Sequence, residues 1–264
     1  MNKTMKKKIS YFCIFMIICL LSLPAQAVGE GYSWYIRRAK EHAAPGIEAQ
    51  TNALLKKYDG YYLNNACLGI NGEKVIYLTF DVGYENGNVG KTLDIVKEEN
   101  VKGSFFVLSH FLKSAPNIAK KMVDEGHLVC NHTASHKNSC NLNEEELRRE
   151  IQALEEVYEN LTNKKLSPYF RPPEGKYDEK TLALAKKMGY KTVFWSLAYA
   201  DWDDSKAPSD EKAKQILMDN THNGAIVLIH PTSDINVRIL KDMIHYWKNE
   251  GYRFGSLEEL KGQL

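Results

Sequence analysis

The 264-residue sequence lacks a strong excess of either charge. Its 35 Lys and Arg nearly balance its 33 Asp and Glu, for a formal net charge of +2. Four of the lysines lie within the first eight residues, so the rest of the chain is close to neutral. A nucleic-acid-binding protein usually shows a basic field, and we therefore expect no nucleic-acid partner.

Cysteine is scarce as well. Of the 5 cysteines, three lie beyond residue 27, namely Cys67, Cys130 and Cys140. Their spacing fits none of the cysteine patterns of structural zinc sites. One disulfide with a free thiol and three reduced, packed thiols are both compatible with this odd number.

A long apolar run occurs only near the N-terminus, from Ile9 to Leu23. It follows a lysine-rich start and precedes the sequence Ala25-Gln26-Ala27. A basic segment, an apolar segment and an A-x-A site together describe a secretory signal peptide. We expect residues 1–27 to be cleaved and the protein to be secreted. The alternative is an uncleaved membrane anchor, since the run approaches a spanning length; membrane contact is expected only through this segment.

Beyond residue 72 the chain alternates regularly between strand-like and helix-like patterns. Amphipathic segments predict the helices, including one opened by Asn143 as N-cap with Glu146 three residues later. Alternation of this kind implies a parallel sheet covered by helices. Seven runs rich in β-branched and aromatic residues indicate the strands: 75–81, 104–108, 128–131, 169–171, 192–197, 225–230 and 252–254.

Seven strands favour a barrel, with an open doubly wound sheet as the alternative. The open sheet would carry a G-x-G-x-x-G loop after its first strand, and residues 83–87 do not fit that pattern. We therefore predict an α/β protein with a barrel domain over residues 72–264. Residues 28–71 are predicted to form an N-terminal extension that packs on the barrel, and we expect a monomer.

Polar groups directly follow five of the predicted strands. Catalytic groups gather at the C-terminal ends of strands in barrels of this kind. Two histidines four residues apart can also converge on one divalent ion, for which zinc is well suited. Taken singly, each group has an ordinary structural explanation, such as a turn or a packed core histidine. The groups are Asp81, His132 with His136, Arg171 with Glu174, Asp201 beside Trp202, and His230.

Together, their order and spacing resemble the polysaccharide deacetylase family, a family of carbohydrate esterases. The resemblance runs from about Val75 to Phe254, most of the mature chain. Residues 79–83 stand where the family has T-F-D-D-G, and residues 132–136 match H-[ST]-x-x-H. R-P-P-x-G, D-W and L-x-H are matched by residues 171–175, 201–202 and 228–230. The resemblance implies the deformed (β/α)7 barrel of that family.

The resemblance also implies a role for each polar group. Asp81 is the expected general base that deprotonates the attacking water, and His230 the general acid that protonates the leaving amine. Arg171 would pair with Asp81 and hold it ionised. Asp201 would orient His230 and stabilise its charged form.

Further implied contacts surround the reacting acetyl group. His132 and His136 would bind a divalent metal ion, most simply zinc. The metal and the backbone N–H of Glu174 would stabilise the tetrahedral oxyanion. Trp202 and Leu228 would form an apolar wall around the acetyl methyl.

One position departs from the family pattern. The second Asp of T-F-D-D-G, the family's third metal ligand, is Val82 here. Valine cannot coordinate a metal, and catalytic zinc sites usually keep three protein ligands. Three possibilities follow: Asp81 also touches the metal, the metal is weakly bound, or the chemistry depends mainly on the acid–base pair.

Residues 83–87 resemble the subgroup that deacetylates N-acetylmuramic acid in spore cortex, where the free amine closes on the lactyl carboxyl to give muramic-δ-lactam. The implied protein is a hydrolase of peptide-stripped peptidoglycan glycan strands, in the cell wall or the forespore intermembrane space. The alternatives are an N-acetylglucosamine or chitooligosaccharide deacetylase, and a glycan-binding protein on a degenerate scaffold. Retention of both Asp81 and His230 favours an enzyme, because a binding protein needs neither.

Overall fold

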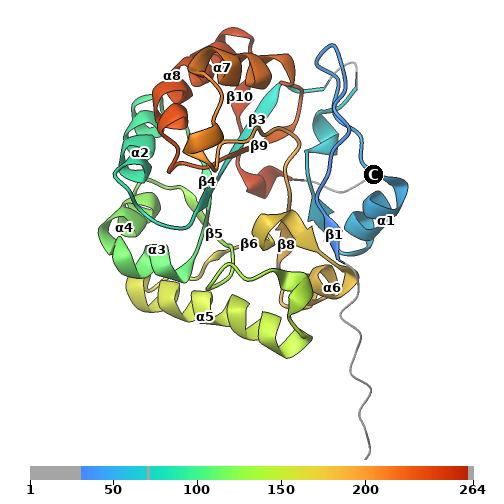
Figure 1. Ribbon diagram of the computed structural model, residues 1–264, viewed down its shortest axis with the longest axis vertical. Helices are drawn as coiled ribbons and strands as arrows, with labels where there is room; N and C mark the ends of the chain where they lie inside the picture. The colour runs from blue at the N-terminus through green and yellow to red at the C-terminus, as the bar shows by residue number, and fades with distance from the viewer. Residues whose placement is uncertain (1–30, 70–71, 261–264) are drawn as a thin grey trace, which may run out of the picture.

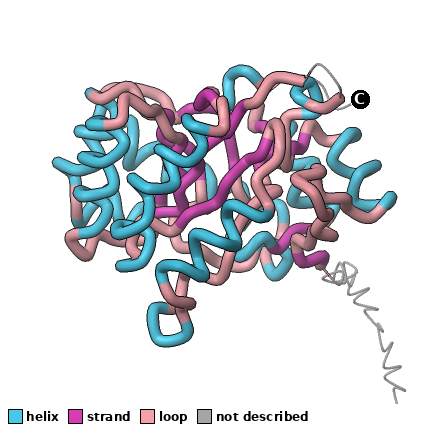
Figure 2. Tube along the Cα trace, turned by 90° about the horizontal axis from the view of Figure 1, so that it is seen from above, coloured by secondary structure: helices cyan, strands magenta, loops and turns pink. Residues whose placement is uncertain are grey.

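Parallel strands form the centre of the molecule and helices surround them (Figures 1 and 2). The computed structural model describes residues 31–69 and 72–260, so the predicted leader, residues 1–27, lies outside the described residues. The strands of the main sheet are β2 (Gly60–Tyr61), β3 (Val75–Val82), β4 (Ser104–Val107), β5 (Leu128–Asn131), β6 (Ser167–Phe170), β8 (Lys191–Val193), β9 (Ala225–Ile229) and β10 (Arg253–Phe254).

The sheet closes into a barrel. Strand β3 pairs in parallel with β9 on one side and with β4 on the other, and the sheet continues through β5, β6 and β8. The chain after β8 then returns to β9, where Leu197 forms a parallel bridge with Val227. The N–H of Leu228 donates to the carbonyl of Leu197 at 2.9 Å. The predicted (β/α)7 barrel is thereby confirmed, and the open-sheet alternative is wrong.

Strand β3 runs through the middle of the core. Of its 8 residues only Asp81 is not fully buried. A parallel strand with neighbours on both edges and packed side chains on both faces needs such a nearly continuous apolar sequence. The break in this burial at Asp81 marks the point where the strand reaches the open end of the barrel.

Helices cover the outside of the strands, as Figure 2 shows. Helix α5 begins as predicted: the Asn143 side chain accepts from the N–H of Glu146, and the Glu146 carboxylate accepts from the N–H of Asn143. Within the described residues, no helix is both long and apolar enough to cross a membrane. The helices are α1 (Ala49–Lys57), α2 (Asn88–Glu98), α3 (Ser109–Ser114), α4 (Pro116–Asp124), α5 (Glu144–Thr162), α6 (Glu179–Lys187), α7 (Asp210–Asp219) and α8 (Asp234–Asn249).

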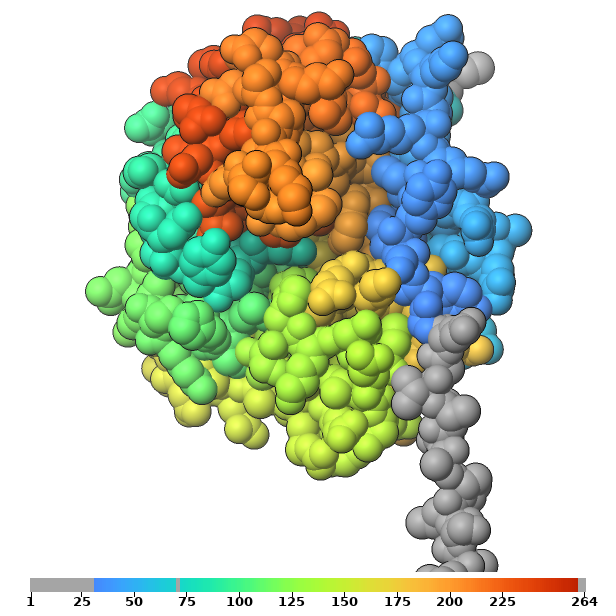
Figure 3. Space-filling model, viewed as in Figure 1, coloured from blue at the N-terminus to red at the C-terminus, as the bar shows by residue number. Residues whose placement is uncertain are grey.

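The N-terminal segment lies along one side of the barrel, against the chain around β8 (Figure 3). Strand β1 (Tyr32–Ser33) pairs with β7 (Lys176–Tyr177), and β2 pairs with β8. Trp34 stacks on Phe194 with ring centroids 4.3 Å apart, and its indole N–H donates to the carbonyl of Trp195 at 2.9 Å. These contacts attach the segment directly to the strand that precedes the Asp201 loop.

The three cysteines of the described residues are buried free thiols. Burial raises the pKa of Cys140 to about 11, so this thiol stays protonated at ordinary pH. Of the two possibilities left open by the sequence, the structure contains the packed thiols.

Candidate active site

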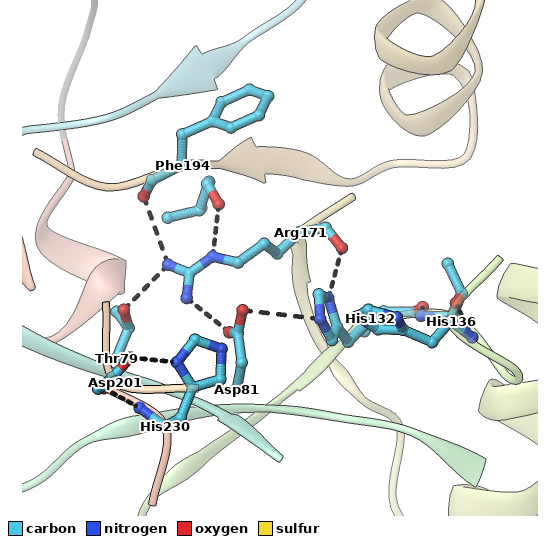
Figure 4. A network of polar contacts seen from close by, with 11 residues as sticks. Thr79, Asp81, His132, His136, Arg171, Phe194, Asp201 and His230 are labelled. Carbon is cyan, nitrogen blue, oxygen red and sulfur yellow. Dashed lines mark hydrogen bonds and ion pairs between the residues drawn. The ribbon is translucent and has the colours of Figure 1, made fainter. Parts of the chain in front are cut away.

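The predicted polar groups meet at the C-terminal end of the barrel strands (Figure 4). Phe80 of β3 is the register partner of Ile229 of β9. The next residues along these two strands are Asp81 and His230, so they leave the barrel as neighbours on adjacent parallel strands. The strand pairing alone therefore brings the expected base and the expected acid to the same place.

Arg171 holds Asp81 in place through a hydrogen-bonded ion pair. Its Nη1 donates to Asp81 Oδ1 at 2.7 Å, and its Nη2 donates to the Thr79 hydroxyl at 2.9 Å. The side chain of Arg171 is fully buried and its guanidinium carbon lies 4.1 Å from the ring centroid of Phe106. A buried guanidinium needs such a complete set of acceptors, and here a carboxylate is one of them.

This arrangement keeps Asp81 ionised. Burial alone would raise the pKa of Asp81, but the permanent charge of Arg171 opposes it and leaves the pKa below its usual value. An ionised carboxylate at neutral pH can accept a proton from water. The geometry therefore suits Asp81 as a general base.

His230 is held by Asp201. The two residues are joined by hydrogen bonds from His230 Nδ1 to Asp201 Oδ1 at 2.7 Å and from the backbone N–H of His230 to Asp201 Oδ2 at 2.8 Å. The Asp201 side chain is 1% exposed and the His230 side chain 25% exposed. Burial alone would lower the pKa of His230, but the hydrogen bond and charge of Asp201 raise it above its usual value. The imidazolium with Nδ1 occupied by Asp201 can release a proton from Nε2.

His132 and His136 lie on the loop that follows β5, with ring centroids 5.0 Å apart. Thr133 and His136 both adopt left-handed backbone conformations, with φ of 72° and 58°, which non-glycine residues rarely do. Glu150 of α5 holds this loop: its carboxylate accepts from the N–H of Ser135 at 2.9 Å and from the Ser135 hydroxyl at 2.6 Å. Contacts from a buried helix carboxylate thus support the strained loop.

The two histidines fit a metal site only in part. The carbonyl of Arg171 accepts from His132 Nδ1 at 2.8 Å, and burial lowers the pKa of His132 to about 4, so its Nε2 offers a lone pair. That Nε2 lies 3.6 Å from Asp81 Oδ2. Val82 is fully buried and offers no donor. Within residues 31–69 and 72–260, no group of three His, Cys, Asp or Glu side chains is arranged to hold a metal ion. The donor set is therefore incomplete for a three-ligand site.

The remaining predicted residues line the same end of the barrel. Leu228 of β9 is 4% exposed, whereas Trp202 is 70% exposed with its ring centroid 6.3 Å from that of His230. Glu174 sits in a short helical turn after the paired prolines, with φ of 58°. The backbone therefore turns sharply at the peptide whose N–H was expected to face the oxyanion.

Several residues of the site were missing from the sequence-based prediction. Thr79 lies inside the first motif, and its hydroxyl both accepts from Arg171 and donates to the carbonyl of Val227 at 2.7 Å. Glu150, Tyr199 and Asn236 lie outside the five motifs, and no sequence pattern pointed to them. They contribute through the residues that they hold rather than through a position at a strand end.

Comparison with known proteins decides the family. A profile of the polysaccharide deacetylase family matches residues 69–193. The peptidoglycan-N-acetylmuramic acid deacetylase PdaA of Bacillus subtilis is 37% identical over 257 residues, which cover 97% of this chain and 96% of PdaA. The chain belongs to the polysaccharide deacetylase family. As a polysaccharide deacetylase it is a hydrolase of amide bonds.

Other members of the family are also similar to this chain in structure and in sequence. The structure of B. subtilis PdaA, a family 4 carbohydrate esterase, has a TM-score of 0.82 and 38% identity, covering 88% of this chain and 97% of that one. A peptidoglycan-N-acetylglucosamine deacetylase of Bacillus cereus is 34% identical over 190 residues, 70% of this chain and 67% of that protein. A family 4 pseudoenzyme from Bacillus anthracis is 30% identical with a TM-score of 0.70, covering 77% and 69%.

Proposed function

We propose that this polysaccharide deacetylase hydrolyses the N-acetyl group of N-acetylmuramic acid in peptidoglycan glycan strands whose peptides have been removed. The observation that carries the proposal is the presence of two hydrogen-bonded pairs at one end of the barrel, Asp81 with Arg171 and His230 with Asp201. Arg171 keeps Asp81 ionised, and Asp201 favours the protonated form of His230. The near full-length similarity to PdaA supports N-acetylmuramic acid as the sugar.

Each of the two pairs carries out one of the proton transfers of amide hydrolysis. Asp81 takes a proton from a water molecule as the water oxygen attacks the acetyl carbonyl carbon. His230 then gives a proton from Nε2 to the sugar nitrogen, and the carbon–nitrogen bond breaks. The products are acetate and a free amine on the glycan. The proton held by Asp81 passes to solvent and His230 regains one, which restores the starting state.

The oxyanion and the acetyl methyl need their own contacts. We assign the backbone N–H of Glu174 to the oxyanion, because the turn at Glu174 follows directly on Arg171 and the two rigid prolines. Leu228, two residues before His230 at the end of β9, and Trp202, whose ring lies beside that of His230, are assigned to the methyl. A divalent ion, with zinc the first choice, would be held loosely by His132 and His136.

The location and the later fate of the product belong to the same proposal. A signal peptide over residues 1–27 would carry the enzyme out of the cytoplasm to the peptidoglycan, which lies outside the cell membrane. The amine formed on a peptide-free muramic acid would lie near the lactyl carboxyl and close on it to give muramic-δ-lactam. We propose spore cortex as the setting and a monomer as the active form, with residues 28–71 packed on the barrel domain, residues 72–264.

A second candidate is a glycan-binding protein without turnover. It is favoured by Val82, which removes a metal donor, and by the existence of a pseudoenzyme with the same fold. Against it stand the intact hydrogen bonds of Asp81 and His230 with their partners. A deacetylase of N-acetylglucosamine or chitooligosaccharides is the remaining alternative.

Mass spectrometry of glycan strands separates these candidates. The mature protein is incubated with peptidoglycan glycan strands, with and without their peptides, and with chitooligosaccharides of similar length. We expect loss of acetyl groups from the muramic acid residues of the peptide-free strands. Deacetylation confined to N-acetylglucosamine residues, or bound glycan with every acetyl group retained, would contradict the proposal.

A further inference from the structure

Asn236 lies behind the His230–Asp201 pair, in the first turn of α8. It is 2% exposed, and the sequence patterns did not identify it. Its Nδ2 donates to Asp201 Oδ2 at 2.6 Å and to the carbonyl of His230 at 3.0 Å. One amide group therefore contacts both members of the pair from the side away from solvent.

The orientation of this amide is itself fixed. Asp201, when ionised, only accepts hydrogen bonds, so the NH₂ group of Asn236 must face it. On the other side, the Tyr199 hydroxyl donates to Asn236 Oδ1 at 2.6 Å. Burial and the nearby charge of Asp201 raise the pKa of Tyr199, so its hydroxyl keeps the proton that it donates. Tyr199 thus prevents the amide from flipping.

Asp201 consequently accepts three hydrogen bonds. Oδ1 receives the imidazole Nδ1–H of His230, while Oδ2 receives the backbone N–H of His230 and the amide of Asn236. With Oδ2 occupied twice, the carboxylate is held so that only Oδ1 is directed at the imidazole. Rotation of the carboxylate would break bonds on both oxygens.

We propose that Asn236, locked by Tyr199, is a positioning residue that holds Asp201 in register with His230. It acts through Asp201 and touches neither substrate nor the reacting atoms. The inference rests on the proposed function for its catalytic consequence. Its structural part concerns only the hydrogen bond between Asp201 and His230.

Two substitutions separate positioning from packing. Asn236→Asp keeps the size of the side chain and can still accept from Tyr199. In its ionised form it cannot donate to Asp201, and the two adjacent carboxylates repel each other. Tyr199→Phe removes one oxygen atom and frees the amide to flip. Tyr246→Phe, at a half-buried tyrosine on the same helix α8, is the matched control for loss of a hydroxyl.

The hydrogen bond itself is measured by proton NMR, without substrate. The Nδ1–H of His230 should give a downfield resonance in the wild type and in Tyr246→Phe, assigned by its loss in His230→Ala. We expect this resonance to disappear in Asn236→Asp and to weaken in Tyr199→Phe. A folded Asn236→Asp protein that keeps the wild-type resonance would overturn the inference.

Kinetics give a second measurement. We expect Asn236→Asp to lower kcat by roughly 10–100-fold with KM nearly unchanged, the size typical of residues that orient a functional side chain from behind it. Tyr199→Phe should fall between this variant and the wild type. Wild-type kcat in both variants would overturn the inference. A wild type that releases no acetate would instead refute the proposed function, while the NMR result would still decide the role of Asn236.

Discussion

Arg171 is the residue on which the site depends most. Its guanidinium donates to Asp81, to the Thr79 hydroxyl and to the carbonyls of Val193 and Phe194. A planar group with five donors can serve these acceptors at once, which the ammonium of a lysine cannot do. The same residue therefore joins three strands of the barrel and favours the ionised form of Asp81, the proposed base.

Replacing Arg171 should move the pH dependence of the reaction. Without the cation the pKa of Asp81 rises, and because the base must be ionised, the acidic limb of the pH–rate profile should shift to higher pH. Arg171→Met also leaves a buried carboxylate without its partner, which typically costs about 3–5 kcal/mol of stability. The profile of kcat/KM against pH is the measurement, with Arg171→Lys as the variant that keeps the charge. An unchanged limb in folded Arg171→Met would show that Arg171 is only structural.

Val82 occupies the position at which the family pattern has a metal-binding Asp. Val82→Asp restores the second carboxylate of the family motif T-F-D-D-G, and we expect it to tighten the binding of zinc, measured by calorimetric titration of chelator-treated protein. Activity need not rise, because a second carboxylate next to Asp81 would raise the pKa of the base when no metal is bound. If the wild type binds zinc as tightly as Val82→Asp, another side chain already completes the site, and Asp81 is the nearest candidate.

At the scale of elements, helix α5 supports the loop that carries His132 and His136. Asn143 begins the helix with a capping box, and Glu150, about two turns later, holds Ser135. Asn143→Ala should lower the free energy of unfolding by about 1 kcal/mol, because it leaves helix N–H groups without an acceptor. Thermal unfolding is the measurement.

The opposite end of α5 provides the control. Asn163 ends the helix in a left-handed conformation, with φ of 55°. Glycine adopts this conformation without strain, so Asn163→Gly should leave the stability nearly unchanged. Equal losses in Asn143→Ala and Asn163→Gly would mean that the capping box does not stabilise α5.

Elements with a clear periodicity were predicted well. All seven predicted strands occur, and α5 begins at its predicted N-cap, Asn143. The short elements were missed: α3 has 6 residues and β2 has 2, too few for a hydrophobic period to show. Their formation depends on neighbours, since α3 follows β4 directly and β2 pairs with β8, which is distant in sequence.

At the scale of the whole molecule, the barrel explains why the motifs could be read from the sequence. Each predicted site residue lies near the C-terminal end of a strand or in the loop that follows it, and parallel strands bring all such ends to one rim. Tyr199 and Asn236 could not be found in this way. Asn236 contacts Asp201, and Tyr199 contacts Asn236, only because α8 packs against the loop after β8. Their roles depend on tertiary packing that no local pattern encodes.

The most direct test of the account is acetate release from peptide-free glycan strands by the wild type, Asp81→Asn and His230→Ala. The wild type should release many acetate molecules per enzyme molecule. Each variant should lose roughly 10²–10⁴-fold in rate, the contribution of a general acid or base, while circular dichroism shows a folded protein. Near-normal release by either folded variant, or glycan binding by the wild type without any acetate, would contradict the assignment of Asp81 and His230 as the catalytic pair.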